Sequence, residues 1–221
     1  MTLSNITADL VHYTYFRSSA AFRTRIALNL KGLSYEDVYV HLRKNEQVSA
    51  DYLTLNPQGL VPTLVHDGHA ISQSLAIMEY LDEVFPEPPF LPKDALGRAR
   101  VRQIAYAVAC DIHPINNLRV RRYLQHDMGH SEADVLTFMV HWMKEGFDAL
   151  EAMLSAGKKT GHFCHGDVPT LSDICLIPQM ANARGAEMDL SAWPTLKRIE
   201  KAAYELPAFV AALPKNQPDA D

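Results

Sequence analysis

The stretch Val11–Gly32, VHYTYFRSSAAFRTRIALNLKG, constrains the fold of this chain more than any other. Its pattern predicts a short strand over residues 11–16 that turns at Arg17-Ser18-Ser19 directly into an amphipathic helix ending near Gly32. The start of a helix leaves several backbone N–H groups unpaired and carries about half a positive charge. An anion therefore suits this position, and a thiolate is the anion that we expect there.

Side chains around this helix start favour the same chemistry. Ser18 and Ser19 supply hydroxyl donors, and Arg17 and Arg23 add positive charge. A second interpretation needs no ligand, because serine is also a preferred N-cap residue. The strand-serine-helix pattern by itself leaves both interpretations open.

Pro62 lies inside an apolar run that otherwise resembles a strand. Because proline cannot donate to a sheet ladder, we expect a bend at a sheet edge, with either a trans or a cis bond before it. Such a bend would turn the backbone N–H and C=O of Val61 outward, where they could pair with an extended, peptide-like ligand. An edge-strand proline without any ligand is the alternative.

A second polar helix start follows at Ser72-Gln73-Ser74. The next residues, LAIMEYLDEVF, carry apolar side chains at helical spacing, so Ser72 or Gln73-Ser74 begins a helix. Its N-terminus is again suited to an anion. Up to Phe85 the predicted order is strand, helix, strand, helix, strand, strand, helix.

This order and its motifs resemble the thioredoxin-like domain of a glutathione transferase. The run SSAAFRTRIAL, Ser18–Leu28, is similar to the zeta-class motif Ser-Ser-Cys-Ser-x-Arg-x-Arg-Ile-Ala-Leu. The similarity continues through Asn56-Pro57, Val61–Leu64, Gln73–Ile77 and Gln217–Asp219, and so covers nearly the whole chain. The resemblance implies a glutathione transferase fold, with an α/β thioredoxin-like N-terminal domain and an all-α C-terminal domain.

The proline-rich run Pro86–Pro92 predicts the linker between these domains. We expect a glutathione-binding domain over residues 1–86 and an all-helical domain with substrate contacts over residues 93–221. The apolar spacing predicts one or two helices over residues 94–124, interrupted or kinked at Pro114. It predicts further helices over residues 131–155, 171–183, 195–204 and 207–213. We expect the helix over 171–183 to be broken or bent at Pro178. Thr170 and Asp173 predict a capping box, which we interpret as structural.

A second concentration of polar groups lies between Asp111 and Arg122. Arg119 and Arg122 are three residues apart and share a helix face, and arginine is well suited to bidentate binding of a carboxylate. A solvated helix face is the alternative. The family resemblance favours the first interpretation, because related enzymes place glutathione and substrate contacts on this helix.

The zeta class includes maleylacetoacetate isomerase and related bacterial maleylpyruvate isomerases. The resemblance therefore implies a glutathione-dependent cis–trans isomerase of aromatic catabolism, in which a thiolate adds to the alkene, a single bond rotates and elimination follows. Ser18 would be the catalytic residue that holds the thiolate. The predicted glutathione contacts are Ser18, Ser19, Val61, Gln73, Ser74, His113 and Asn117, and the predicted substrate contacts are Arg17, Arg119 and Arg184.

Several departures from the family pattern keep other functions open. Ala20 replaces the cysteine of the motif, and Arg184, followed by Gly185, stands one place earlier than the family's arginine, which turns a helical side chain by about 100°. Tyr15 could activate the thiol instead of Ser18, as a tyrosine does in other transferase classes, although a core aromatic is the alternative. The functional alternatives are a general transferase or dehalogenase and a non-catalytic binding module.

Composition narrows the partners and the compartment. The net charge of −5 (21 basic against 26 acidic residues) argues against a nucleic-acid or anionic-membrane surface, and no apolar run approaches the ~18 residues of a membrane span. Three cysteines without a close pair suit a reducing compartment, and the histidine pairs lack further ligands, so we expect no metal. The first residues, MTLSNITADLV, lack a signal-peptide pattern. We therefore expect a cytoplasmic enzyme, and the resemblance implies a homodimer.

Overall fold

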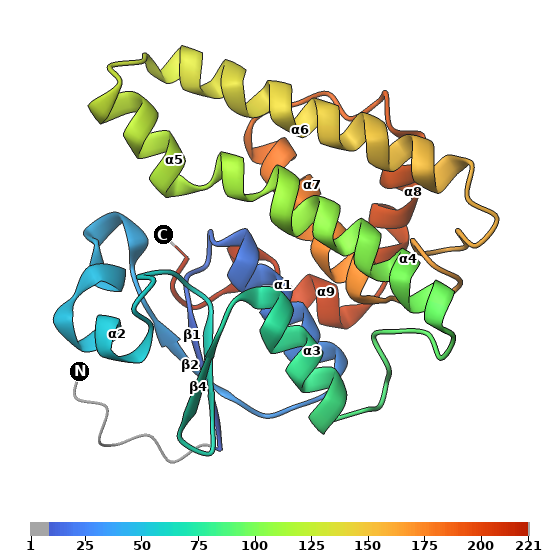
Figure 1. The fold of residues 1–221 in the computed structure, drawn as a ribbon, viewed down its shortest axis with the longest axis horizontal. Coiled ribbons are helices and arrows are strands. Elements are labelled where there is room, and N and C mark those ends of the chain that lie inside the picture. Colours follow the sequence, from blue (N-terminus) through green and yellow to red (C-terminus); the bar gives the residue numbers. More distant parts are fainter. Residues whose placement is uncertain (1–8, 221) are drawn as a thin grey trace. The chain divides into compact units, whose positions relative to one another are not determined.

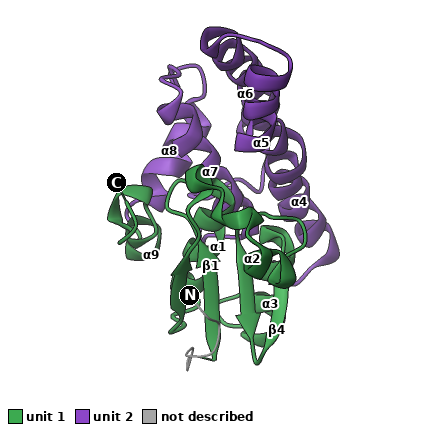
Figure 2. Ribbon diagram, turned by 90° about the vertical axis from the view of Figure 1, so that its left-hand side faces the viewer, with its two compact units in different colours: residues 1–89, 206–221 green, residues 90–205 purple. Residues whose placement is uncertain are grey.

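A computed structural model describes residues 9–220 of the chain, with the elements labelled in Figure 1. The described residues form two compact units, coloured separately in Figure 2. Unit 1 takes in residues 1–89 and 206–221, and unit 2 takes in residues 90–205. Part of the N-terminal segment considered for a signal peptide lies outside the described residues.

Unit 1 contains a four-stranded sheet with the order β2-β1-β3-β4. Strand β1 pairs in parallel with β2 and antiparallel with β3, which in turn pairs antiparallel with β4. The elements of the predicted order are β1 (Leu10–Thr14), α1 (Ser19–Leu30), β2 (Glu36–Tyr39), α2 (Ala50–Leu55), β3 (Thr63–His66), β4 (His69–Ser72) and α3 (Ser74–Val84). The predicted sequence of strands and helices is thus confirmed, including the helix that begins at Ser74.

Alternation along β1 assigns its two faces. Tyr13 lies in an apolar cluster and its ring contacts that of Tyr52 on α2, with a centroid distance of 5.9 Å. His12 and Thr14 point to the opposite face, where they bond side chains of α1. Helices α1 and α3 pack together on that face, and α2 lies on the other (Figure 1).

His12 is completely buried and joins three elements of unit 1. Its Nδ1 lies 2.8 Å from Oδ1 of Asp37 on β2, and its Nε2 lies 2.7 Å from Oγ1 of Thr24 on α1. Burial lowers the pKa of His12 below its usual value of 6.5, although the Asp37 carboxylate opposes this shift. A neutral imidazole therefore links the sheet to α1.

The C-terminal segment belongs to unit 1, although the expected helical domain extended to residue 221. Helix α9 (Pro207–Ala211) contacts α1, and Asn29 Nδ2 donates to the C=O of Ala208 at 3.1 Å. Arg25 Nε donates to the C=O of Ala212 at 3.1 Å. These side-chain bonds are long-range, so the helical period of this segment could not reveal which unit it joins.

Unit 2 contains α4 (Ala95–Tyr106), α5 (Leu118–Arg122), α6 (Glu132–Ser155), α7 (Leu171–Gly185) and α8 (Pro194–Ala203). The helix expected over residues 94–124 is interrupted as predicted: a π-helical turn, Ala107–Ile112, follows α4, and a 3₁₀ turn, Pro114–Asn116, begins at the proline. Pro178, by contrast, lies inside the continuous helix α7, so the helix is not broken there. None of the described helices could cross a membrane, because none is both long and apolar enough.

The predicted capping box opens α7. Asp173 Oδ2 accepts the N–H of Thr170 at 2.8 Å, and Asp173 Oδ1 accepts the N–H of Cys164 at 2.8 Å. Both residues are buried, and desolvation raises the pKa of Asp173 above its usual range. The carboxylate thus closes the helix start and holds the preceding loop, which agrees with a structural role.

Candidate active site

The predicted site residues of unit 1 meet at one end of the sheet. The register pairs Tyr13 of β1 with Thr63 of β3, and Thr63 in turn with Ser72 of β4. The segments that follow β1, precede β3 and follow β4 therefore lie at the same end of the sheet. These segments carry Arg17 to Ser19, Val61, and Gln73 with Ser74, so the fold brings together residues far apart in the chain.

Ser18 caps α1, as the second interpretation of the motif predicted. Its Oγ accepts the N–H of Ala21 at 3.2 Å, and its own N–H donates to the C=O of Tyr15 at 2.9 Å. This geometry also leaves the anion site possible, because a hydroxyl that accepts one bond keeps its hydrogen for another. Ser19, the first residue of α1, is buried, whereas Ser18 is partly exposed. Ser18 can therefore cap the helix and donate to a ligand at once.

Val61 precedes β3 and is joined to Pro62 by a cis peptide bond. The prediction that Pro62 marks a sheet edge is wrong, because β3 lies between β1 and β4. Since Pro62 stands before the first residue of β3, the ladder needs no N–H from it. Within residues 9–220, neither the N–H nor the C=O of Val61 takes part in a hydrogen bond of the chain. Both groups are thus available to an extended ligand.

Gln73 has an unusual backbone at the start of α3. Its φ of 72° and ψ of 117° lie in a region that costs a non-glycine residue about 1–3 kcal/mol. Its side chain does not cap the helix, and its Nε2 donates instead to Oε1 of Gln58 at 2.7 Å. Backbone strain of this size is commonly found where a site requires a particular geometry. We therefore treat this turn as part of the candidate site.

Arg23 has a different role from the one that the sequence indicated. Only 1% of the residue is exposed, and its Nη1 donates to Oγ of Ser74 at 3.2 Å. Because a guanidinium can only donate, Ser74 Oγ must be the acceptor, and the hydroxyl hydrogen remains for another partner. Arg23 thus places positive charge behind the start of α3. Sequence reasoning placed this charge at Ser18, and only the packing of α1 on α3 reveals its position.

Arg17 occupies the exposed turn before Ser18. Its guanidinium carbon lies 5.1 Å from the centre of the Phe16 ring, a cation–π contact. Because Arg17 immediately precedes Ser18 in the chain, its positive charge lies close to Ser18.

Four predicted site residues belong to unit 2. His113 ends the π-helical turn after α4, and Asn117 caps α5, where its Oδ1 accepts the N–H of Val120 at 3.2 Å. Arg119 is exposed on α5. Arg184 forms an ion pair with Glu200 of α8, and its Nε donates to Glu200 Oε1 at 3.0 Å, which raises the pKa of Arg184. Any carboxylate bound by Arg184 would have to compete with Glu200.

Comparison with known proteins decides the family. The model of the glutathione S-transferase N-terminal domain matches residues 8–83. A maleylpyruvate isomerase from Ralstonia sp is 46% identical over 207 residues, which cover 94% of this chain and 98% of that protein. A solved maleylpyruvate isomerase that is 45% identical is a bacterial glutathione S-transferase of the zeta class. The chain belongs to the zeta class of the glutathione transferases. This confirms the family and the fold class that the Ser18–Leu28 motif predicted.

Solved structures of zeta-class and related enzymes agree with this assignment. A bacterial maleylpyruvate isomerase of the zeta class superposes with a TM-score of 0.94 at 45% identity, covering 96% of this chain and all of that one (100%). Maleylacetoacetate isomerase from Methylobacterium extorquens AM1, with bound malonate and glutathione, has a TM-score of 0.93 at 42% identity. That comparison covers 96% of this chain and 99% of the other.

Within the zeta class, Tyr15 fits the interpretation as a core aromatic. Only 4% of the residue is exposed, and its ring contacts those of Phe16 and His41 at centroid distances of 4.9 and 5.2 Å. Ala20 follows Ser18 and Ser19 in α1, so no thiol stands at the position where the zeta motif has cysteine. In this zeta-class chain, Ser18 is thus the better-placed hydroxyl for a thiolate.

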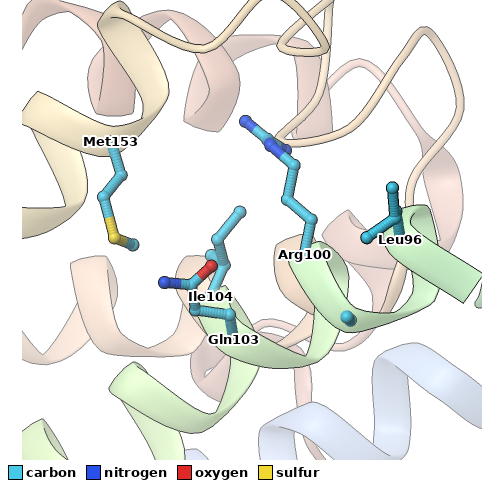
Figure 3. Close-up of a pocket in the computed structure, with 6 residues that line it drawn as sticks. Leu96, Arg100, Gln103, Ile104 and Met153 are labelled. Carbon is cyan, nitrogen blue, oxygen red and sulfur yellow. The ribbon is translucent and has the colours of Figure 1, made fainter.

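Unit 2 also contains two hollows. A hollow of about 620 Å³ lies in unit 2 between α4 and α6, and Figure 3 shows Arg100 and Met153 beside it. A second hollow, of about 310 Å³, is lined by Cys110, Trp142 and neighbouring residues. Neither includes a predicted site residue. Among residues 9–220, no three His, Cys, Asp or Glu side chains gather closely enough to hold a metal ion.

Proposed function

We propose that this protein is a glutathione-dependent cis–trans isomerase that converts maleylacetoacetate or maleylpyruvate into its fumaryl isomer. The observation that carries the proposal is Ser18, whose partly exposed hydroxyl stands at the start of α1 in a zeta-class chain. The relatives at 46% and 44% identity are a maleylpyruvate isomerase and a probable maleylacetoacetate isomerase, so the class of substrate is supported and the choice between the two stays open.

The residues at the sheet end fit glutathione. An extended tripeptide can pair its backbone with the available N–H and C=O of Val61. Its γ-glutamyl carboxylate suits the start of α3, where Gln73 and Ser74 stand and Arg23 adds charge from behind. Ser18 and Ser19 then take the thiol end at the start of α1. His113 and Asn117 of unit 2 stay predicted contacts for the remaining part of glutathione.

When bound, glutathione supplies the nucleophilic sulfur that turns the alkene carbon–carbon bond temporarily into a single bond. The protein's task is to keep that sulfur ionised at neutral pH, although a free thiol has a pKa near 8.5. The Ser18 hydroxyl can donate to the sulfur, and the first N–H groups of α1 supply partial positive charge. Ser18 would thus lower the thiol's pKa without exchanging a proton itself.

The maleyl substrate adds a demand for positive charge near the sulfur, because it carries at least one carboxylate. Arg17 meets this demand within unit 1, since it immediately precedes Ser18 and is exposed. Arg119 and Arg184 are the proposed contacts from unit 2, and Arg184 would have to share its charge with Glu200. Charge at these positions would also stabilise the enolate that develops in the reaction.

We further propose a homodimer that acts in the cytoplasm in aromatic catabolism. Leu96 on α4 is 83% exposed beside the hollow of unit 2, which is apolar surface that a second copy could cover. Cys110, Cys164 and Cys175 are all free thiols, which suits a reducing compartment. Residues 1–86 stay the proposed glutathione-binding part. The proposed substrate-binding part, expected over residues 93–221, is reduced to residues 93–205, because the residues after 205 belong to unit 1.

The direct test is an isomerase assay with purified protein, with and without glutathione, on both maleyl substrates. Ser18→Ala should raise the pKa of the bound thiol and lower turnover by on the order of a hundredfold, because one charge-stabilising donor is lost. Tyr15→Phe is the matched control and should leave both values unchanged. If Tyr15→Phe alone abolished the thiolate absorbance, the tyrosine would be the activating residue.

The alternatives give different results in the same assay. A general transferase would conjugate or dehalogenate small electrophiles and leave both maleyl substrates unchanged. A non-catalytic binding module would do neither, although glutathione could still bind. Absence of isomerisation by the wild-type protein on both maleyl substrates would refute the proposed function.

A further inference from the structure

The turn that presents Ser18 is held by two charged side chains from outside it. Arg25, on α1, donates through Nη2 to the C=O of Phe16 at 3.1 Å and through Nη1 to the C=O of Tyr15 at 3.4 Å. Asp219 Oδ2 accepts the N–H of Phe16 at 3.0 Å. Both backbone polar groups of Phe16 are therefore bonded to charged side chains, two residues before Ser18.

Arg25 also connects this turn with the C-terminal segment. Only 1% of the residue is exposed, and beyond the turn it donates to Thr14 Oγ1 at 3.1 Å and to the C=O of Ala212 at 3.1 Å. Burial lowers its pKa to about 10, while the charges of Asp37 and Asp219 act in the opposite direction. Arg25 thus stays cationic at neutral pH, and Asp219 is close enough for its charge to raise the pKa of Arg25.

Asp219 reaches this turn from a distant part of the chain. It is 203 residues from Phe16 in sequence, and it follows α9 and a 3₁₀ turn, Pro214–Asn216. Gln217 anchors the same segment, because its Nε2 donates to the C=O of Ala211 at 2.8 Å and to that of Leu213 at 2.9 Å. The carboxylate is therefore supplied by a segment that its own hydrogen bonds hold against the end of α9.

We propose that Asp219 is a positioning residue for catalysis, which holds the Phe16 N–H and so fixes the direction of the Ser18 hydroxyl. The inference rests on the proposed role of Ser18. Phe16 is separated from Ser18 only by Arg17. Ser18 also keeps its bonds to Ala21 and Tyr15, so loss of the Phe16 N–H bond should shift the hydroxyl from its position and not release it. A displacement of about 1 Å from a reacting geometry can lower a rate by up to a hundredfold.

Three variants test this proposal. Asp219→Ala removes the acceptor, Asp219→Asn keeps an oxygen acceptor without the charge, and Glu83→Ala removes an exposed carboxylate elsewhere in unit 1. In Asp219→Ala we expect the bound thiol's pKa to rise and kcat to fall by about tenfold, with a smaller change in KM for glutathione. Asp219→Asn should restore most of both values, and Glu83→Ala should match the wild type. Replacement of Arg25 is less informative, because it removes four hydrogen bonds at once.

Amide hydrogen exchange of the ligand-free protein gives a readout that needs neither glutathione nor substrate. The Phe16 and Ser18 amides should exchange faster in Asp219→Ala than in the wild type, and Asp219→Asn should restore their protection. Faster exchange with an unchanged thiol pKa and kcat would overturn the positioning role, as would unchanged exchange. A wild type that neither isomerises maleyl substrates nor lowers the thiol's pKa would instead refute the proposed function.

Discussion

Ser74 provides the sharpest test of glutathione recognition, because its hydroxyl is expected to bond both the Arg23 guanidinium and the carboxylate of glutathione. Its Oγ accepts from the buried Arg23 guanidinium at 3.2 Å, so its hydrogen is left for the γ-glutamyl carboxylate. Ser74→Ala would remove both interactions. The variant should therefore lose stability and glutathione affinity together, each by an amount that can be estimated.

The loss of stability follows from the hydrogen bond to a charged group. Such a bond contributes about 1.5–3 kcal/mol, and a buried guanidinium that loses its acceptor adds to the effect. For a chain of this length, 1 kcal/mol corresponds to roughly 2–4 °C in melting temperature. With a loss of about 2 kcal/mol, Ser74→Ala should melt about 4–8 °C below the wild type.

The loss of affinity follows from the other bond. A charge-assisted hydrogen bond to the carboxylate of about 2 kcal/mol corresponds to roughly a thirtyfold rise in Kd, which calorimetry can measure below the melting temperature. Ser49→Ala is the matched control, because Ser49 Oγ caps α2 by accepting the N–H of Tyr52 at 3.3 Å. It should lose about 1 kcal/mol of stability and no glutathione affinity.

Two results would contradict this reasoning. If Ser74→Ala kept the wild-type Kd but melted lower, the hydroxyl would serve Arg23 alone, and the carboxylate would have to bind the backbone N–H groups of α3. If Ser49→Ala weakened glutathione binding as much as Ser74→Ala does, the loss would reflect general destabilisation of unit 1.

Three further predictions address the substrate, the assembly and the pH dependence of stability. Arg17→Met or Arg119→Met should lower isomerase activity far more than conjugation of a neutral electrophile; equal losses in both assays would indicate a structural role. Light scattering at micromolar concentration should give twice the 24.7 kDa chain mass, and the monomer mass would contradict the proposed dimer. Because burial lowers the pKa of His12, the unfolded chain binds the extra proton below pH 6.5, so the free energy of unfolding should fall as pH drops through this value. The slope, up to about 1.4 kcal/mol per pH unit for one proton, should decrease in His12→Gln, and an unchanged slope in denaturant titrations would exclude His12 as its source.

The local part of the site could be predicted from the sequence because its signals are local. A strand, a turn and a helix that begins at a serine occupy consecutive positions at Ser18, and the same holds for Gln73 and Ser74 at α3. Each pattern depends on neighbours within a few residues, which is the range of helix capping and of apolar periodicity. The motif at Ser18 was also specific enough to predict the family that the comparisons confirm.

The side chains behind the site depended on tertiary structure. Arg23 and Arg25 are two residues apart on α1, yet one bonds Ser74 of α3 and the other bonds the turn before Ser18 and the C=O of Ala212. The contact of Asp219 with Phe16 spans 203 residues. The sequence alone determined which helix starts could hold an anion. Only the packing of α1, α3 and the C-terminal segment decided which charged groups support these helix starts. A buried arginine bonds the chain segments that surround it, and the local pattern of apolar residues does not predict which segments those are.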